Sequence, residues 1–180
     1  GGGSGGGSIY VYANTDSYLY IYNCIFRNNE AITKADDPVY QRAQGGAVNV
    51  NGGTTYIYDS EFIDNSANYI GGAIRMCGKK FEAHRTLFKN NTAAIAGGAF
   101  TNGGCYGYGY SALKFYEVSF VDNSLTDPCS PGQSYGFGDC PDNAPAGWAT
   151  DVVVEYGWPE YIFVNPVISN PMSPHMLWFG

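Results

Sequence analysis

Gly71-Gly72-Ala73-Ile74 opens a phrase that closes with Phe88-Lys89-Asn90-Asn91, and the chain repeats this phrase along most of its length. The opening returns as Gly45-Gly46-Ala47-Val48 and Gly97-Gly98-Ala99-Phe100. The closing returns as Phe26-Arg27-Asn28-Asn29, Phe62-Ile63-Asp64-Asn65 and Phe120-Val121-Asp122-Asn123. Successive glycine pairs are 26 residues apart. A fixed step of this length predicts a solenoid, in which near-identical coils stack on one another.

Alternating apolar residues predict the strands of each coil. The glycine pair leads into a first strand with one apolar face, as at Val48 and Val50. A second strand follows, and an apolar residue then recurs five positions later, as from Ile21 to Phe26. Because an odd offset cannot stay on one face of a regular strand, a corner or bulge must lie between. We expect this corner near Asn23, Asp59, Arg85, Glu117 and Asn165.

The composition indicates one strand-rich domain over residues 1–180. The chain has 25 glycines and 16 tyrosines, which favour tight corners and pleated strands over helices. Its net charge of −7 repels polyanions, so we expect no nucleic-acid partner. No stretch of 18 apolar residues is present, so we expect no membrane span. The absence of an initiator Met and of a signal h-region suggests a mature or excised piece of a longer extracellular protein.

Five cysteines indicate disulfides rather than a metal or redox site, because the gaps between them are all long. Cys77 and Cys105 follow successive glycine-led strands at similar distances, so in a stack they would lie roughly one above the other. Cys129 and Cys140 bracket a loop rich in proline and glycine and form a second candidate bridge. Cys24 is then left as a buried thiol, and the compartment would be oxidising. The alternative is that all five cysteines are reduced.

The asparagines after each phenylalanine predict a ladder of amide side chains. Its four members are Asn29, Asn65, Asn91 and Asn123. If the coils stack in register, each amide donates to the coil above and accepts from the coil below. The alternative is a calcium site built from Asp64 and Asp122, but Asn90 supplies no carboxylate between them. Asn90 also starts the chain's only Asn-x-Ser/Thr acceptor, which makes it a candidate glycosylation site in a eukaryotic secreted chain.

Outward positions of the second strands carry tyrosines that would form an aromatic strip along the stack. They are Tyr20, Tyr22, Tyr56, Tyr58 and Tyr116, with His84 in the same series. Exposed aromatic patches mark contact surfaces for a glycan or another protein. The alternative is that tyrosine is a good strand residue that pairs with its neighbours.

Insertions and the first residues depart from the regular coil. The three insertions are 31–44, 105–111 and 125–150. The second carries Tyr106, Tyr108 and Tyr110, in either an exposed binding loop or a loop folded back on the coil wall. Residues 1–8 have the composition of an engineered flexible linker. Their end aligns with the repeat, since Gly6-Gly7-Ser8-Ile9 matches Gly45-Gly46-Ala47-Val48, and this alignment favours the opening of a first coil.

The repeated Gly-Gly-Ala-(Ile/Val) and Phe-x-x-Asn motifs resemble the polymorphic outer-membrane protein repeats first defined in chlamydial autotransporters, over nearly the whole chain. The resemblance implies an all-β, right-handed parallel β-helix, here of about five coils, that acts on or outside a cell surface in adhesion or as a structural wall. The last coil departs from the pattern, because Asp151-Val152-Val153-Val154 lacks the glycines and Ile168-Ser169-Asn170 replaces the Phe motif. No transporter barrel is present, so no autotransporter role is carried over.

The sequence favours a role without catalysis. Right-handed β-helices include polysaccharide lyases and hydrolases, whose chemistry needs converging carboxylates or a basic residue beside bound calcium. Asp59 and Glu61 have no matching carboxylates in the coils on either side, and His84 has no orienting partner in the sequence.

We therefore expect an extracellular structural or adhesive subunit with no cofactor, whose partner is a second copy or another extracellular protein. Neither terminus resembles an amphipathic cap, which suggests a fibre assembled by end-to-end stacking. The rival is a carbohydrate-binding or polysaccharide-degrading β-helix that uses the tyrosines as sugar platforms.

Overall fold

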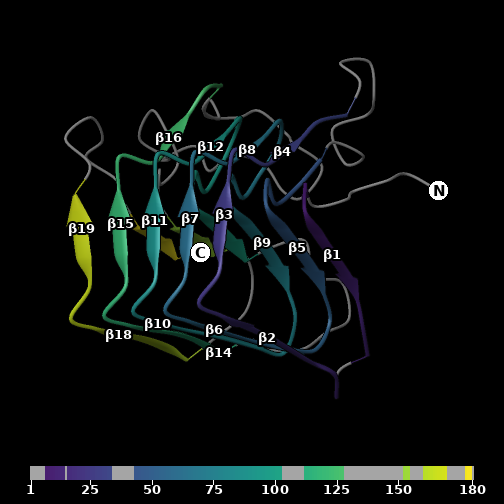
Figure 1. Cartoon of the computed structure of the whole chain (residues 1–180), viewed down its shortest axis with the longest axis vertical. Coiled ribbons are helices and arrows are strands. Elements are labelled where there is room, and N and C mark those ends of the chain that lie inside the picture. Colours follow the sequence, from purple (N-terminus) through teal and green to yellow (C-terminus); the bar gives the residue numbers. More distant parts are fainter. Residues whose placement is uncertain are drawn as a thin grey trace.

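The structure is a computed structural model that describes residues 7–14, 16–33, 43–102, 112–127, 152–154, 160–169 and 177–179 (Figure 1). Over these ranges all regular secondary structure is β-strand. The expected all-β class is therefore confirmed. With no helix among them, the described residues contain no helical segment of the length and apolarity that crossing a membrane requires.

The strands form four parallel sheets, which we number I to IV. Sheet I contains β1 (Ile9–Tyr12), β5 (Val48–Asn51), β9 (Ile74–Cys77), β13 (Phe100–Asn102), β17 (Val152–Val154) and β20 (Leu177–Phe179). Sheet II contains β2 (Tyr18–Tyr22), β6 (Thr54–Tyr58), β10 (Lys80–His84), β14 (Ala112–Tyr116) and β18 (Tyr161–Val164). Sheet III contains β3 (Ile25–Arg27), β7 (Glu61–Ile63), β11 (Leu87–Lys89), β15 (Ser119–Val121) and β19 (Val167–Ser169). Sheet IV contains β4 (Glu30–Ala31), β8 (Ser66–Ala67), β12 (Thr92–Ala93) and β16 (Ser124–Leu125).

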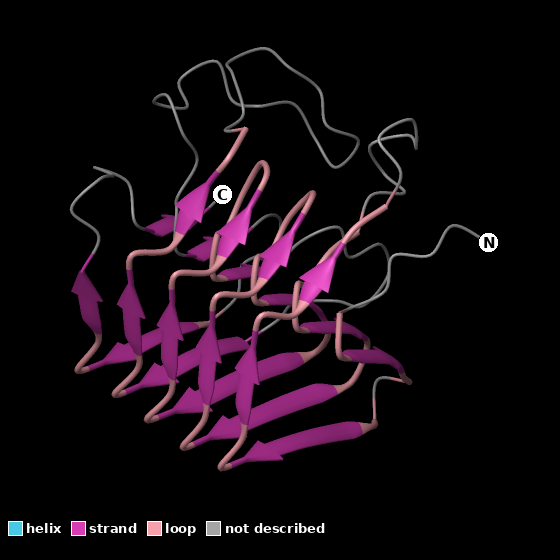
Figure 2. Ribbon diagram, turned by 45° about the horizontal axis from the view of Figure 1, so that its top comes forward, coloured by secondary structure: helices cyan, strands magenta, loops and turns pink. Residues whose placement is uncertain are grey.

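From β1 to β16, consecutive strands belong to consecutive sheets, so the chain visits sheets I, II, III and IV in turn before it returns to sheet I (Figure 2). The later described strands β17, β18 and β19 lie in sheets I, II and III, and β20 lies in sheet I again. We call each such passage a coil, numbered from β1–β4. Strands pair with the equivalent strand of the next coil wherever the described part of that coil has one, as Phe62 pairs with Phe88 and Phe88 with Phe120. This regular parallel stacking is the arrangement expected of a parallel β-helix. Two features were not predicted: the two-residue strands of sheet IV, and β20, which adds a strand to sheet I beyond coil five.

Residues in the left-handed conformation make two kinds of corner in the coils. The first corner, between sheets II and III, has positive φ angles at all five predicted positions: Asn23 (51°), Asp59 (49°), Arg85 (45°), Glu117 (55°) and Asn165 (50°). The second corner, between sheets III and IV, was not predicted and lies at Asn28 (56°), Asp64 (55°), Asn90 (54°) and Asp122 (52°). Asn and Asp tolerate this conformation because their short side chains bond locally, which explains their frequency at the second corner.

The glycine pair is required where neighbouring coils touch backbone to backbone. Gly71 has a φ of 67°, a region that L side chains avoid. Gly72 packs against the next coil, and a Cβ there would lie 2.0 Å from the carbonyl oxygen of Gly98. Gly7 is packed in the same way, with its Cβ position 2.1 Å from the Gly46 carbonyl oxygen. The end of the glycine-serine run therefore takes the place that the repeat alignment assigned to it.

The core lies between the sheets and is continuous along the stack. Phe26, Phe62, Phe88 and Phe120 form a column with ring centroids 4.8, 5.1 and 5.1 Å apart. Phe62, Phe88 and Phe120 are fully buried, whereas Phe26 of coil one is only partly buried. Full burial of such a ring contributes about 1.5 to 3 kcal/mol relative to exposure. The core is therefore closed in the middle coils and partly open at coil one.

Candidate functional site

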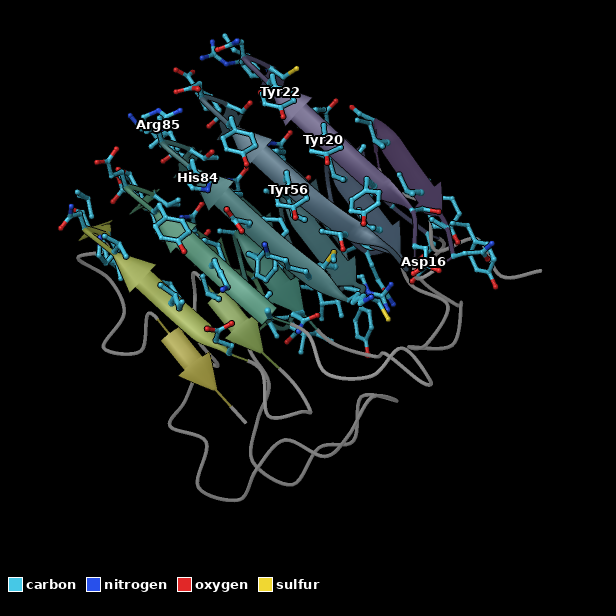
Figure 3. All side chains as sticks on the ribbon, turned by 90° about the horizontal axis from the view of Figure 1, so that it is seen from below. Asp16, Tyr20, Tyr22, Tyr56, His84 and Arg85 are labelled. Atoms are coloured by element: carbon cyan, nitrogen blue, oxygen red, sulfur yellow. The ribbon has the colours of Figure 1, made fainter. Side chains whose placement is uncertain are left out.

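The outer face of sheet II carries two columns of aromatic side chains (Figure 3). One column runs from Tyr22 through Tyr58 and His84 to Tyr116, with centroid separations of 5.0, 4.8 and 4.5 Å. The second is shorter and pairs Tyr20 with Tyr56 at 5.2 Å. The parallel register of β2, β6, β10 and β14 produces this alignment, because equivalent residues lie directly above one another. The tyrosines of the predicted strip in these strands thus share one surface.

The rings in these columns stack on one another. Interplanar angles between successive rings are 7° to 14°, and the separations are those of offset-stacked aromatic pairs. Tyr56, Tyr58 and Tyr116 are therefore only partly exposed, because a neighbour covers each ring on at least one face. Tyr18, which was not predicted, joins Tyr20 and Tyr22 in coil one, and these three rings are 64, 52 and 52 % exposed. Tyr106, Tyr108 and Tyr110 lie outside the described residues.

A row of linked ionisable side chains, Lys80, Glu82 and His84, lies along β10 among the aromatic columns. The Lys80 Nζ lies 2.6 Å from Glu82 Oε2, and the other carboxylate oxygen, Oε1, lies 2.7 Å from His84 Nε2. Lys80 also donates to the Tyr56 hydroxyl at 3.4 Å and sits 4.9 Å from the centre of the Tyr56 ring. The expectation that His84 lacks an orienting partner was therefore wrong. Alternate residues of a strand point to one side, so the i and i+2 spacing of Glu82 and His84 was the available signal.

The contacts of Lys80, Glu82 and Tyr58 shift their pKa values. Burial raises the pKa of the Glu82 carboxyl, but hydrogen bonds from Lys80 and His84 outweigh burial and hold this pKa below its ordinary value. The bond to Glu82 raises the pKa of Lys80. Burial, and then the charge of Glu82, raise the pKa of Tyr58. All three pKa values move away from neutrality, which is opposite to the tuning of an acid–base catalyst at neutral pH.

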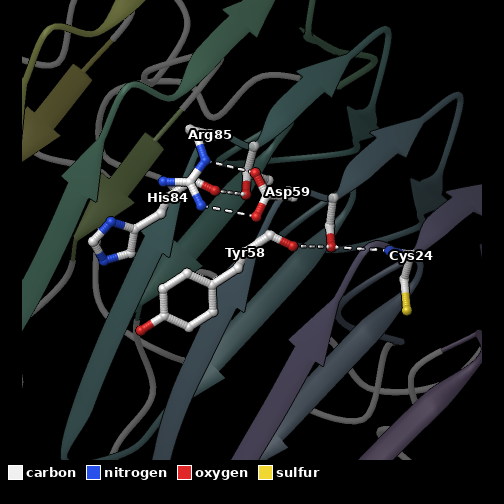
Figure 4. Close-up of polar contacts among 7 residues, drawn as sticks. Cys24, Tyr58, Asp59, His84 and Arg85 are labelled. Carbon is white, nitrogen blue, oxygen red and sulfur yellow. Dashed lines mark hydrogen bonds and ion pairs between the residues drawn. The ribbon is translucent and has the colours of Figure 1, made fainter.

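A second ion pair lies at the edge of this surface, at the first corner (Figure 4). The Nε and Nη2 atoms of Arg85 donate to the two carboxylate oxygens of Asp59 at 2.6 and 2.8 Å. These bonds lower the pKa of Asp59 and raise the pKa of Arg85. Ser60, which follows Asp59 in coil two, donates to the Tyr58 carbonyl and accepts from the Cys24 backbone N–H of coil one. The corner positions are thus tied together across coils one to three.

The predicted amide positions form a hydrogen-bonded ladder inside the second corner. The Nδ2 of Asn29 donates to Asn65 Oδ1 at 2.8 Å, Asn65 to Asn91 at 2.9 Å, and Asn91 to Asn123 at 2.9 Å. The Nδ2 atoms of Asn65, Asn91 and Asn123 also donate to a Phe carbonyl of the preceding coil, at 3.0, 2.9 and 3.1 Å. At coil one the Asn29 Oδ1 accepts from the Ser8 hydroxyl. Asn65, Asn91 and Asn123 are buried, so this ladder is part of the scaffold.

The remaining predicted residues fall into separate places. Asn90 is exposed at the second corner, where its Nδ2 donates to Asp64 Oδ1 at 3.1 Å. Cys24 is a free thiol that is partly rather than fully buried, which corrects the expectation of a buried residue. Cys77 is buried and is not a free thiol, while its predicted partner Cys105, together with Cys129 and Cys140, lies outside the described residues. The pairing of these cysteines stays a prediction.

Asp64 and Asp122, the alternative calcium ligands, do not lie in a cluster of metal-binding side chains. Within the described ranges no three His, Cys, Asp or Glu side chains gather closely enough to hold a metal ion. Both aspartates are instead second-corner residues with positive φ.

Comparison with known proteins gives no match: no protein-family model, no curated protein and no solved structure matches the chain.

Proposed function

We propose that the chain is an extracellular, non-enzymatic structural or adhesive module, built as a right-handed parallel β-helix with the outer face of sheet II as its contact surface. The right hand is proposed because crossover connections between parallel strands are almost always right-handed and because the repeat motifs resemble those of right-handed β-helices. The extracellular setting rests on the same resemblance and on the cysteine pattern.

The observation that carries this proposal is the stacked aromatic face of β2, β6, β10 and β14. It is wide, rigid and amphipathic, since each tyrosine adds an apolar ring and a hydroxyl. Its charges are already paired, because Glu82 is shared between Lys80 and His84. A partner that lies across this face gains apolar contact without separating Glu82 from Lys80 or His84. This combination is typical of contact surfaces rather than of reactive sites.

Attachment of the purified chain to a defined surface tests the proposal. Beads that carry the chain are applied to a surface coated with an extracellular-matrix extract, and retained beads are counted under flow. We expect the double variant Tyr58→Ser and Tyr116→Ser to reduce retention by roughly tenfold, since two rings are removed from the contact face. The matched control, Arg27→Ser with Lys89→Ser, changes sheet III and should retain wild-type attachment.

A carbohydrate-active role is the second candidate, and the exposed ring faces of Tyr18, Tyr20 and Tyr22 favour it. Release of reducing ends from a polysaccharide panel, lost in a Glu82→Gln variant, would replace the adhesive proposal by an enzymatic one. Saturable binding to one polysaccharide without turnover would instead identify the contact partner as a glycan.

A further inference from the structure

The exposed apolar surface of the described residues is concentrated at coil one. Among the described residues, the exposed large hydrophobic side chains all belong to this coil except Val164 and Val167. In coil one they are Tyr10, Tyr12, Tyr18, Tyr20, Tyr22, Ile25 and Ile32. Most inward residues of the same coil are incompletely covered: Ile9, Val11, Leu19 and Phe26 are only partly buried, although Ile21 is buried. Their counterparts Val48, Val50 and Phe62 of coil two are all buried.

Coil one is also the outermost layer of the described stack, with one unpaired edge in each sheet. Each of β1, β2, β3 and β4 pairs with a strand of coil two on one side and with no strand in the described part of the chain on the other. Such an edge presents unpaired N–H and C=O groups, which pair readily with another strand. The interface that would cover it continues the coil-to-coil contact already present between coils one and two.

Stacking one copy head to tail on another meets an obstacle at the opposite end. Sheets II and III end in coil five, at β18 and β19, but sheet I continues with β20, which pairs with β17. In head-to-tail stacking, coil one of the second copy would follow coil five of the first. Its β1 would then have to pair with β17 of the first copy, at the edge that β20 already occupies. The coil-one ends of two copies meet no such obstacle, since all four sheets end there at the same level.

The sequence of β2 is suited to a two-fold axis. Its residues Tyr18-Leu19-Tyr20-Ile21-Tyr22 alternate aromatic and aliphatic side chains symmetrically about Tyr20. In an antiparallel pair of two β2 strands centred on Tyr20, Tyr20 faces its own copy, Tyr18 faces Tyr22, and Leu19 faces Ile21. The three outward rings lie 6.2 and 6.0 Å apart within 17° of parallel, and each lacks a ring neighbour on the side away from coil two among the described residues.

We propose that the occupant of this end is a second copy of the chain, in a head-to-head dimer whose two-fold axis passes beside Tyr20 and in which the two β2 strands pair antiparallel. This proposal concerns the end of the stack and does not depend on adhesion by the face of sheet II. It replaces the fibre expectation with a closed assembly, because a two-fold interface uses the same surface on both copies and leaves nothing to propagate from it.

Disulfide trapping tests the geometry in the full chain, with Cys24→Ser in the background to remove the free thiol. Tyr20→Cys places two thiols opposite each other across the axis, at a separation that antiparallel pairs and disulfides share. We expect mild oxidation to convert most of this variant to a covalent dimer. The matched control is Tyr56→Cys, one coil inward on the same column, which should stay unlinked.

Solution mass supplies an independent reading. Light scattering of the unmodified chain should give twice 19.4 kDa. Tyr20→Arg puts two like charges face to face and should weaken the dimer by at least about 100-fold, while Tyr56→Arg should leave it intact. Circular dichroism establishes that both variants fold.

Three results would overturn the proposal. The first is a monomer at all accessible concentrations. The second is preferential trapping of Tyr20→Cys with Ile162→Cys, which indicates head-to-tail stacking. The third is a dimer that Tyr20→Arg does not weaken. A monomer that still attaches to the coated surface would remove the dimer and leave the adhesive function standing.

Discussion

Asn91 makes two hydrogen bonds to a single atom of the next coil: its backbone N–H and its side-chain Nδ2 donate to the Oδ1 of Asn123 at 3.0 and 2.9 Å. The same residue accepts from both the backbone and the side chain of Asn65 at 3.1 and 2.9 Å. Main chain and side chain of one residue therefore bond in the same direction, and Asn91 couples three coils at once.

We expect Asn91→Ala to lower the free energy of unfolding by about 2 to 4 kcal/mol, because it removes the acceptor of the buried Asn65 backbone N–H and breaks the side-chain bonds to Asn65, Asn123 and the Phe62 carbonyl. Urea denaturation followed by circular dichroism measures the change. Asn29→Ala, at the exposed end of the same ladder, is the control and should cost roughly 1 kcal/mol or less. Equal losses for the two variants would contradict the view that burial makes the ladder strong.

The contact between Gly72 and Gly98 supplies the second prediction. Gly72→Ala would place a methyl group 2.0 Å from the Gly98 carbonyl oxygen and 2.6 Å from Thr92 backbone atoms, so the coils must separate. We expect a loss of about 3 kcal/mol or more, or failure to fold. Ala73→Gly, the neighbouring change of the same size, should cost only about 1 kcal/mol. A melting temperature of Gly72→Ala at or above that of Ala73→Gly would show that the coil spacing yields easily.

The first corner allows backbone conformation to be separated from charge. Arg85→Asn loses the exposed ion pair with Asp59 but keeps a residue that tolerates a φ of 45°. Its urea midpoint should stay close to wild type, since exposed ion pairs contribute little. Arg85→Val loses the same charge and adds a β-branched side chain that disfavours positive φ, so its midpoint should fall clearly. If both variants fell equally, the ion pair rather than the backbone would control this corner.

The lowered pKa of Glu82 predicts that part of the free energy of unfolding is lost in acid. The Glu82 pKa in the folded chain lies below the ordinary value of 4.5, so the unfolded chain binds a proton at higher pH than the folded chain does. The stabilisation is therefore present above pH 4.5 and is lost as the pH falls through the lower folded pKa. Glu82→Gln should be less stable than wild type at pH 7, and this difference should shrink towards pH 3. A difference that stays constant from pH 7 to pH 3 would contradict the assignment.

The coil pattern was predictable because it depends on local chain geometry. The odd offset between Ile21 and Phe26 placed the first corner correctly, since side chains alternate strictly along a strand. The second corner was missed because Asn28 and Asn29 look alike in sequence, although Asn28 turns the chain and Asn29 bonds inward. Within the Phe-x-x-Asn motif, the residue before the final Asn is therefore the turning residue.

The surface was less predictable because it depends on side-chain orientation and on the order of strands. The tyrosine columns followed from register, but the row of linked side chains through Glu82 needs particular rotamers of three neighbours. Residues Leu177–Phe179 of β20 lack the glycine pair that precedes β1, β5, β9 and β13, so the sequence pattern did not predict that strand. That strand changes which end of the stack is open to a second copy.

Parallel stacking also sets how the molecule comes apart. Strand contacts in the described residues join only neighbouring coils. Folding cooperativity is therefore transmitted from each coil to the next rather than through a core shared by all coils. Local opening should therefore fray inward from coil one, where Phe26 and Leu19 are only partly covered. Amide protons of β2 should exchange before those of β10, and a second copy bound at coil one would delay that fraying.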